Sequence, residues 1–252
     1  MTLADDIIPC ARIVEQGDPD RFRTVMAAPV AARACLFPLY AFNVEVARAP
    51  WLTQEPMIAE MRLQWWRDVL EEISTIQPVR KHEVTTPLAA LLSPAQAERL
   101  DTSVAARRWD IYKDPFDDQA HMDAYLDQTA GHLMWTACEL LGAEPEAEEG
   151  VRHVAYAAAV AAFLRAVPAL VEAKRIPLLD GSHQGLAELA RRAKDRLTAQ
   201  AVPSRAKPAL WPAIGAGKTL DQVIRDPAAV GEGRLTPAVP AFGLTWAALT
   251  GR

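Results

Sequence analysis

The segment from Val154 to Val171 reads VAYAAAVAAFLRAVPALV and is almost wholly apolar. A helix of this length and composition could span the hydrocarbon core of a bilayer. Alanine, which is only weakly hydrophobic, is its commonest residue, and Arg165 stands inside it, where a central arginine costs about 2.5 kcal/mol or more on insertion scales. A helix that is apolar all round also suits the core of a large helical protein. We therefore expect a buried central helix that carries Pro168 near its end.

The rest of the chain also carries helix signals. Period-two alternation is not sustained, alanine and leucine dominate, and proline follows a capping residue at Asp18-Pro19, Thr86-Pro87 and Ser93-Pro94. These patterns predict an all-α chain with a shorter helix after Gly185 and longer helices over residues 4–16, 29–49 (bent at Pro38), 56–74, 94–112, 117–141 (stopped by Gly142) and 146–173. Residues 76–87 are expected to be a connector. With no evident linker, we predict one domain over 1–252 whose Pro- and Gly-rich residues after about 200 are less regular.

Composition excludes several classes of protein. The formal net charge is -5, with charges of both signs spread along the chain, so a nucleic-acid partner is not expected. The three cysteines, Cys10, Cys35 and Cys138, are scattered, which argues against a disulfide framework and a zinc site. The first residues lack the basic and apolar regions of a secretory signal. Together these features predict a cytoplasmic protein.

Two short patterns resemble ligand-binding motifs, a phosphate-binding loop and a Mg²⁺ site, but neither is preferred. GAGKT at 215–219 lacks the glycine that a phosphate-binding loop needs where Pro212 stands, and no strand leads into it. Asp123 and Asp127 lie one helical turn apart and could hold Mg²⁺, but a solvated helix edge is the preferred interpretation of such a pair.

Four segments, taken in order, carry a family resemblance. They are LYAFNVEVARAPW (39–51), EMRLQWWRDVLEEI (60–73), AYLDQTAGHLMWTACELLG (124–142) and AFLRAVPALVEAKRIPLL (162–179). This order resembles the squalene/phytoene synthase family, the head-to-head prenyl transferases of the all-α isoprenoid synthase fold. The resemblance runs from about Asp18 to Leu179 and is most specific in YAFN and RLQWW. It implies an isoprenoid synthase-type helical bundle.

The family resemblance also implies a chemistry whose key residues differ here. In that family, aspartates on two facing helices hold Mg²⁺, which neutralises the diphosphate leaving group. The resemblance places those aspartates on Ala47, Arg48, Trp51, Ala166 and Leu170, with upstream polar positions on Ala159 and Ala162. Such side chains cannot bind Mg²⁺. The resemblance therefore implies an active-site framework without metal ligands, and no metal cofactor is expected.

Three segments also resemble one branch of this family, and this resemblance bears on the function of the protein. AFNVEVAR, EMRLQWWRDVLEEI and AAFLRAVP resemble the NADH dehydrogenase (complex I) assembly factor 6 branch, whose members are thought to act as assembly factors. This likeness implies a respiratory NADH dehydrogenase subunit or assembly intermediate as partner. A prenyl lipid or prenyl diphosphate is the candidate ligand, and a peripheral contact with the inner membrane is a candidate location.

Positive and polar side chains are expected around the cavity of such a bundle. The candidates are Arg33, Tyr40, Asn43, Arg48, Arg62, Arg165 and Arg175. Arginine forks suit a diphosphate or another anion. In the interpretation that we prefer, the arginines instead pair with acids such as Glu45, Glu60 or Asp110 and join helices.

Three hypotheses follow from the sequence. In the first, the protein is catalytically inactive and works by binding. In the second, it is an active prenyl-diphosphate transferase whose Mg²⁺ is held by Asp123, Asp127 or Glu45. In the third, it is a scaffold for an unknown partner.

Overall fold

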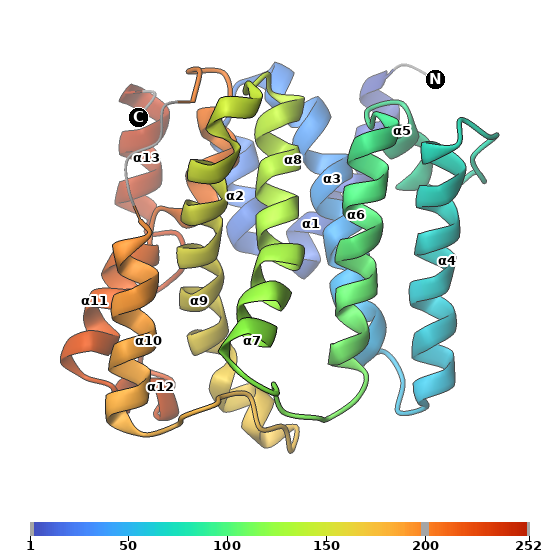
Figure 1. Ribbon diagram of the computed structural model, residues 1–252. Coiled ribbons are helices and arrows are strands. Elements are labelled where there is room, and N and C mark those ends of the chain that lie inside the picture. Colours follow the sequence, from blue (N-terminus) through green and yellow to red (C-terminus); the bar gives the residue numbers. More distant parts are fainter. Residues whose placement is uncertain (1–2, 198–201, 251–252) are drawn as a thin grey trace.

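The computed structural model describes residues 3–197 and 202–250, and in these ranges helices make up all the regular structure (Figure 1). The all-α prediction is confirmed. The α-helices are α1 (Leu3–Gly17), α2 (Pro19–Ala27), α3 (Val30–Arg48), α4 (Pro56–Ser74), α5 (Thr85–Ala89), α6 (Pro94–Ala106), α7 (Gln119–Leu126), α8 (His132–Leu140), α9 (Glu148–Glu172), α10 (His183–Asp195), α11 (Ala216–Arg225), α12 (Ala228–Gly231) and α13 (Ala241–Thr250). Shorter helical turns are η1 (Ala49–Trp51), η2 (Arg107–Asp110), the π-helical η3 (Asp127–Gly131), η4 (Pro145–Ala147) and η5 (Lys207–Ala213).

Local signals fix several helix ends. The Asp18 side chain accepts a hydrogen bond from the Arg21 backbone N–H (2.9 Å) and caps α2, a helix that was not predicted separately. Ser93 forms a capping box with Gln96 at the start of α6. Gly142 adopts a φ of 84° just after α8 and donates its backbone N–H to the Glu139 carbonyl (2.8 Å). This left-handed backbone conformation strains most residues other than glycine. The helix therefore ends at Gly142, as the sequence predicted.

The main correction to the predicted helices concerns the connector over residues 76–87. Its last part begins α5, and Thr86-Pro87 lies inside that helix rather than at its cap. Val84, Thr85 and Leu88 are fully buried, and the Thr85 hydroxyl donates to the Arg80 carbonyl. Packing against the bundle therefore makes a helix where the local sequence indicates a turn. The predicted helix over 94–112 also ends earlier, at α6, and continues as η2.

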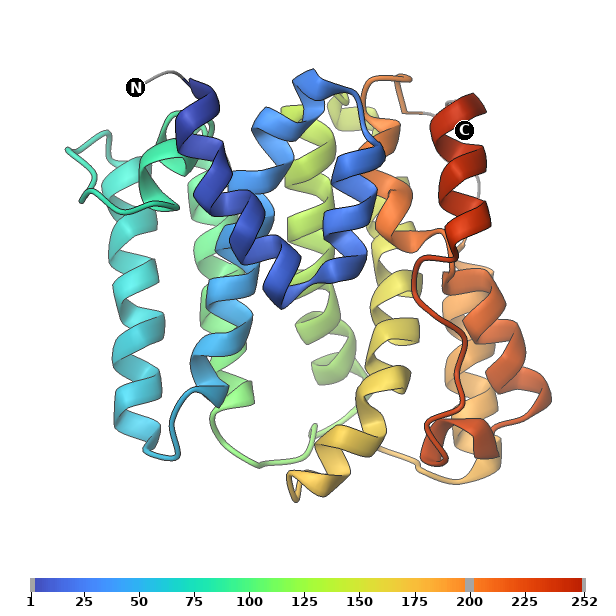
Figure 2. The same ribbon diagram turned by 180° about the vertical axis from the view of Figure 1, so that it is seen from behind.

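Helix α9 runs through the middle of the bundle and contacts α8, α10, α11 and η5 (Figures 1 and 2). One face is buried completely, at Val151, Ala155, Val160 and Leu164 among others. By length and composition, both 145–172 and 30–51 could cross a membrane, but about half of each apolar window is buried inside the molecule. This face of α9 is therefore part of the core. The expectation of a helix buried all round is wrong for the opposite face, where alanines are exposed to a cavity.

Candidate functional site

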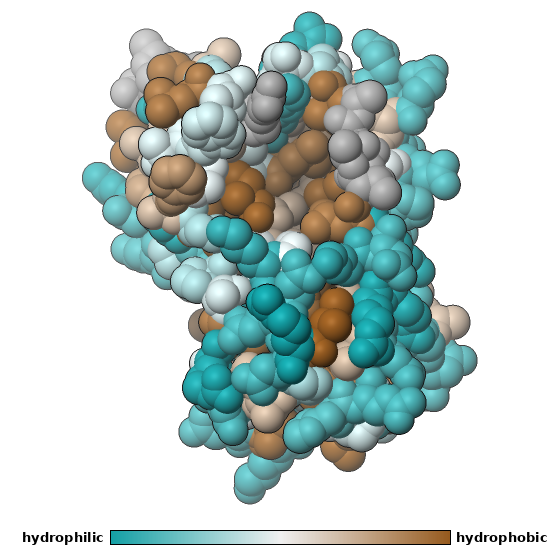
Figure 3. All heavy atoms as spheres, turned by 90° about the vertical axis from the view of Figure 1, so that its left-hand side faces the viewer, coloured by the Kyte–Doolittle hydropathy of each residue, from teal (hydrophilic) through white to brown (hydrophobic). Residues whose placement is uncertain are grey.

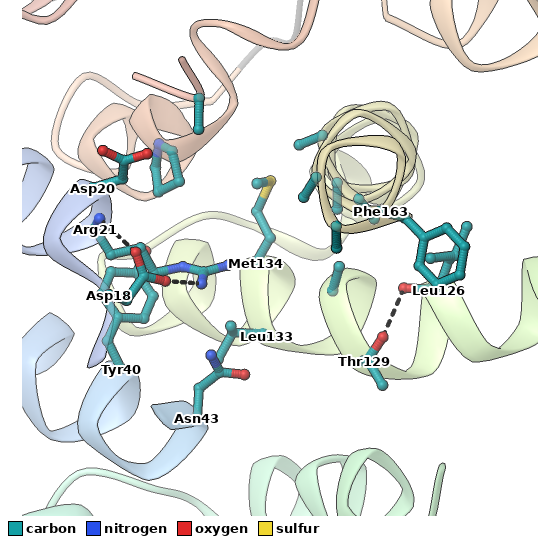
Figure 4. Close-up of a pocket in the computed structure, with 18 of the residues that line it drawn as sticks. Asp18, Asp20, Arg21, Tyr40, Asn43, Leu126, Thr129, Leu133, Met134 and Phe163 are labelled. Atoms are coloured by element: carbon teal, nitrogen blue, oxygen red, sulfur yellow. Dashed lines mark hydrogen bonds and ion pairs between the residues drawn. The ribbon is translucent and has the colours of Figure 1, made fainter. Parts of the chain in front are cut away.

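A cavity of about 440 Å³ lies between α2, α3, η3, α8, α9 and η5 (Figure 4). The α9 wall is built from small side chains. Ala158, Ala159, Ala162 and Ala166 line it, and Phe163 and Arg165 are the large α9 side chains beside them. Leu133 and Met134 of α8 line the cavity as well. Because a pocket of this size and composition can enclose an apolar chain, the α9 wall suits a hydrophobic ligand.

One polar group of the cavity comes from α2 and α3. Arg21 donates to the Asp18 carboxylate (2.5 Å), and its guanidinium lies 5.4 Å from the centre of the Tyr40 ring. Figure 4 shows these three side chains together at one end of the cavity. Burial raises the pKa of Tyr40 well above its usual value, although the charge of Arg21 opposes the shift. The phenol therefore stays protonated at neutral pH and can donate a hydrogen bond.

A second polar group joins η2 to α7. Tyr125 donates its hydroxyl proton to the Asp110 carboxylate (2.9 Å) and accepts a hydrogen bond from Arg107 (2.8 Å). Burial alone would lower the pKa of Arg107. The interactions with Tyr125 and Asp110 raise it by more, so the pKa of Arg107 lies above its ordinary value. Arg107 and Tyr125 both line the cavity. This charged network is thus satisfied internally and fixes one cavity wall.

Arg165 is the third polar feature of the cavity. Its guanidinium donates to the Thr219 hydroxyl (3.1 Å), which is a neutral partner. Burial lowers the pKa of Arg165, and the charge of Asp20 offsets this only in part. A guanidinium has five N–H donors. Arg165 therefore keeps donors for an anionic group in the cavity.

The cavity brings together only some of the candidate residues. Tyr40, Asn43 and Arg165 line it, whereas Arg33, Arg48, Arg62 and Arg175 do not. Arg33 donates to the carbonyls of Met26 (2.8 Å) and Ala28 (3.0 Å) and so supports the end of α2. Arg48 pairs with Glu45 (3.3 Å), one of the expected acids, but both residues belong to α3, so this pair does not join two helices; Arg62 is exposed on α4.

Arg175 has a structural position that the sequence did not predict. Its guanidinium lies 4.7 Å from the Trp51 ring centre and 5.5 Å from that of Trp109. It donates to the backbone carbonyls of Asp110 and Tyr112 rather than to an acid side chain. The expected pairing with a carboxylate is therefore wrong for this residue, because its terminal N–H groups face backbone carbonyls in η2 and just after it.

Several cavity residues were missed from the sequence. They are Asp20, Arg21, Arg107 and Tyr125, while Asp18 was noted only as a helix cap. The acid–base spacing of Asp18 with Arg21 and of Asp20 with Arg23 is a pattern that could have marked α2. That residues of η2 and α7 line the same cavity as residues of α2 has no signal in a single sequence.

The acids considered as alternative metal ligands each bind another side chain. Asp123 accepts a hydrogen bond from Tyr156 (2.7 Å), and Asp127 pairs with Arg152 (2.9 Å). Glu45 pairs with Arg48, and none of the three acids lines the cavity. Across the described residues, no cluster of three or more His, Cys, Asp or Glu side chains could hold a metal ion.

The architecture of the helical bundle places the chain among the isoprenoid synthase-type folds. The structure resembles a dehydrosqualene synthase, with a TM-score of 0.75 over 99% of this chain and 96% of that one, at 13% identity. It also resembles the squalene synthase HpnC from Alicyclobacillus acidocaldarius, with a TM-score of 0.72, 16% identity, and 90% and 95% of the two chains covered. At these identities the likeness shows the fold alone.

The sequence itself gives the family. The sequence model of squalene/phytoene synthases matches residues 14–179, which is more than half of the chain, and the chain therefore belongs to the squalene/phytoene synthase family. This confirms the resemblance found in the sequence.

Within this family, the chain is similar to complex I assembly factor 6 proteins. The chain is 28% identical over 166 residues to a complex I assembly factor 6 homolog of Drosophila melanogaster, covering 63% of this chain and 50% of that protein. It is 26% identical over 170 residues to complex I assembly factor 6 of Homo sapiens, covering 63% and 48%. The chain thus spans about half the length of the curated relatives that it matches.

Proposed function

We propose that this protein acts by binding, as an assembly factor for respiratory complex I, and that it does not catalyse prenyl transfer. The observation that carries the proposal is the alanine wall of the cavity, because the family resemblance calls for a metal-binding aspartate at Ala166 and for other polar side chains at Ala159 and Ala162. The similarity to complex I assembly factor 6 supports the assembly role. The proposed partner is an NADH dehydrogenase subunit or an assembly intermediate.

The chemistry of the cavity supports an inactive protein. Ionisation of an allylic diphosphate needs a divalent cation to neutralise the leaving group, and Mg²⁺ takes oxygen ligands. The carboxylates that line the cavity are Asp18 and Asp20, and each already pairs with an arginine of α2. On this proposal the protein uses no metal cofactor.

The cavity also suits an amphiphilic ligand. The alanine wall would contact an apolar chain, and Arg165 would bind an anionic head group. A prenyl lipid or prenyl diphosphate is the ligand that we propose. We place the protein in the cytoplasm, with a peripheral position at the inner membrane.

Diphosphate release separates binding from catalysis. The purified protein is incubated with farnesyl or geranylgeranyl diphosphate and Mg²⁺, and released diphosphate is measured. We expect no release above the protein-free control. Turnover at enzymatic rates would support the active transferase with a rearranged metal site and would overturn the proposal.

Co-purification tests the assembly role. The tagged protein is purified from its own cells, and NADH dehydrogenase subunits are identified in the eluate. We expect such subunits to be recovered and complex I to be depleted in a deletion strain. If neither occurs, the scaffold hypothesis with an unknown partner is favoured instead.

Filling the cavity tests the ligand. Ala162→Phe places a large side chain in the cavity, whereas Ala95→Phe adds the same bulk at an exposed position at the start of α6. Lipids extracted from each purified variant are identified by mass spectrometry. We expect the first variant to lose a bound prenyl lipid and the second to keep it; equal lipid content in both would refute a ligand in this cavity.

A further inference from the structure

Arg165 is a partly buried cation of the cavity that has no carboxylate partner within residues 3–197 and 202–250. Its guanidinium donates to the hydroxyl of Thr219, which is fully buried and uncharged. Burial lowers the pKa of Arg165, and the charge of Asp20 offsets this only in part. Charged groups removed from water are normally paired with an opposite charge. A ligand can therefore supply the counter-charge that the neighbouring side chains do not.

The other charged side chains that line the cavity are neutralised by neighbours. Each forms an ion pair, in the pairs Arg21–Asp18 (2.5 Å), Arg23–Asp20 (2.6 Å) and Arg107–Asp110 (3.2 Å). Because these pairs add no net charge, the cavity carries the single positive charge of Arg165. One negative charge on a ligand would balance it.

Two uncharged polar side chains of α3, Tyr40 and Asn43, also line the cavity (Figure 4). Neither the Tyr40 hydroxyl nor the Asn43 amide forms a hydrogen bond with another described residue. The hydroxyl can donate, and the amide can both donate and accept. Both groups can therefore bind oxygen atoms of a ligand without changing the charge of the cavity.

A diphosphate head group fits this charge balance poorly. A phosphate monoester alone carries about 1.5–2 negative charges at pH 7, and a diphosphate carries more. A divalent cation could offset the excess, but Asp18 and Asp20, the carboxylates that line the cavity, are already paired. Excess charge in a partly buried cavity is costly. A neutral head group, in turn, leaves Arg165 without a counter-charge.

We propose that the cavity selects a prenyl lipid with a single negative charge, of the carboxylate class, whose head group binds Arg165 while its chain lies along the alanine wall of α9. This inference rests on the proposed function, binding without catalysis, and narrows its ligand. It ranks a prenyl carboxylate above both neutral prenyl lipids and prenyl diphosphates.

Three ligands with the same prenyl chain test the charge of the head group. Geranylgeraniol is neutral, geranylgeranoic acid carries one negative charge at neutral pH, and geranylgeranyl diphosphate carries more. Their binding to the full chain is measured by isothermal titration calorimetry with EDTA, each ligand below its aggregation concentration. We expect the acid to bind at least about tenfold more tightly than either of the other two, because it alone balances the charge of Arg165.

Variants of Arg165 test its role directly. Arg165→Gln keeps a donor for the Thr219 hydroxyl but removes the charge, so the affinity for the acid should fall at least about tenfold while the alcohol binds as before. Binding of the alcohol also shows that the variant is folded. Arg165→Lys restores the charge and should recover part of the preference for the acid. Arg62→Gln, at an exposed position of α4 outside the cavity, should leave all three affinities unchanged.

Apolar surface outside the cavity could also adsorb a prenyl chain. Figure 3 views the side of the molecule that carries α13 and shows such surface gathered in its upper part, whereas the lower part is mostly polar. Ala162→Phe fills the cavity and leaves this outer surface unchanged. We expect it to weaken binding of the acid at least about tenfold.

Four results would overturn the inference. The first is an acid that binds no more tightly than the alcohol or the diphosphate. The second and third are undiminished binding of the acid by Arg165→Gln or by Ala162→Phe. The fourth is an equal loss in Arg62→Gln, which would assign the effect to the overall charge of the protein. All four leave the assembly role standing, whereas diphosphate release with Mg²⁺ would overturn the proposed function itself.

Discussion

Replacing Tyr125 by phenylalanine should destabilise the protein far more than the same replacement at Tyr112. Both hydroxyls donate to a carboxylate, that of Tyr125 to Asp110 at 2.9 Å and that of Tyr112 to Glu60 at 3.0 Å. Tyr125 is 7% exposed and Tyr112 is 46% exposed. The pair of variants therefore isolates the effect of burial on one kind of hydrogen bond.

The magnitude follows from the bonds that are lost. Tyr125→Phe removes one hydrogen bond to Asp110 and one from Arg107, each to a charged group and each contributing about 1.5–3 kcal/mol. Water in the adjoining cavity can replace part of this, so we expect a loss of about 2–3 kcal/mol in the free energy of unfolding. Tyr112→Phe should cost about 0.5 kcal/mol or less, because water replaces the exposed bond.

Urea denaturation followed by circular dichroism measures both values. Comparable slopes with urea concentration are needed so that the midpoints report stability. If the two variants differ by less than about 0.5 kcal/mol, the buried network does not stabilise the fold as argued.

Three further variants test local features of the fold by the same urea assay. Gly142→Ala should cost about 1 kcal/mol or more, because of the positive φ and because the added carbon would meet the Arg205 guanidinium. Gly231→Ala, where nothing lies within 4 Å of the added carbon, should stay within about 0.5 kcal/mol, and equal effects would contradict the reasoning. Ser93→Ala should cost about 1 kcal/mol by removing the α6 cap, and more than Ser74→Ala, whose hydroxyl caps no helix start and donates to the Glu71 carbonyl. Burial, and to a smaller extent the charge of Arg152, lowers the pKa of His132 below its value in the unfolded chain. The unfolded chain therefore binds this proton at a higher pH than the folded protein does. The free energy of unfolding should fall as the pH drops through about 6.5. His132→Asn keeps a donor for the Arg99 carbonyl and should reduce this pH dependence; an unchanged dependence would assign it to other groups.

The helices could be predicted from the sequence where periodicity and end signals agree. Helix α4 matches its predicted range, and α3 differs from its own by one residue at each end. Short elements such as α5 could not be predicted, because this helix forms through the burial of Thr85 and Leu88 in the folded bundle. Periodicity also could not show that Ala162 faces a cavity while Leu164, two residues away, is fully buried.

The site was predicted less completely than the fold. Tyr40, Asn43 and Arg165 were found because the family segments contain them. Arg107 and Tyr125 were missed: Arg107 and Asp110 lie three residues apart in η2, but Tyr125 of α7 meets them only in the folded bundle. Long-range pairing of this kind is a property of the packed bundle and not of any one segment.

The stacking of Arg175 between Trp51 and Trp109 has a mechanical consequence for the cavity. Arg175 follows α9, Trp51 ends the η1 turn after α3, and Trp109 belongs to η2. One side chain therefore joins the ends of α9 and α3 to η2. Helices α3 and α9 are thereby fastened at this end and should separate most easily at the other. A ligand of the proposed kind would then enter beside α2 and residues 238–239, while the end that Arg175 holds between the two tryptophans stays fixed.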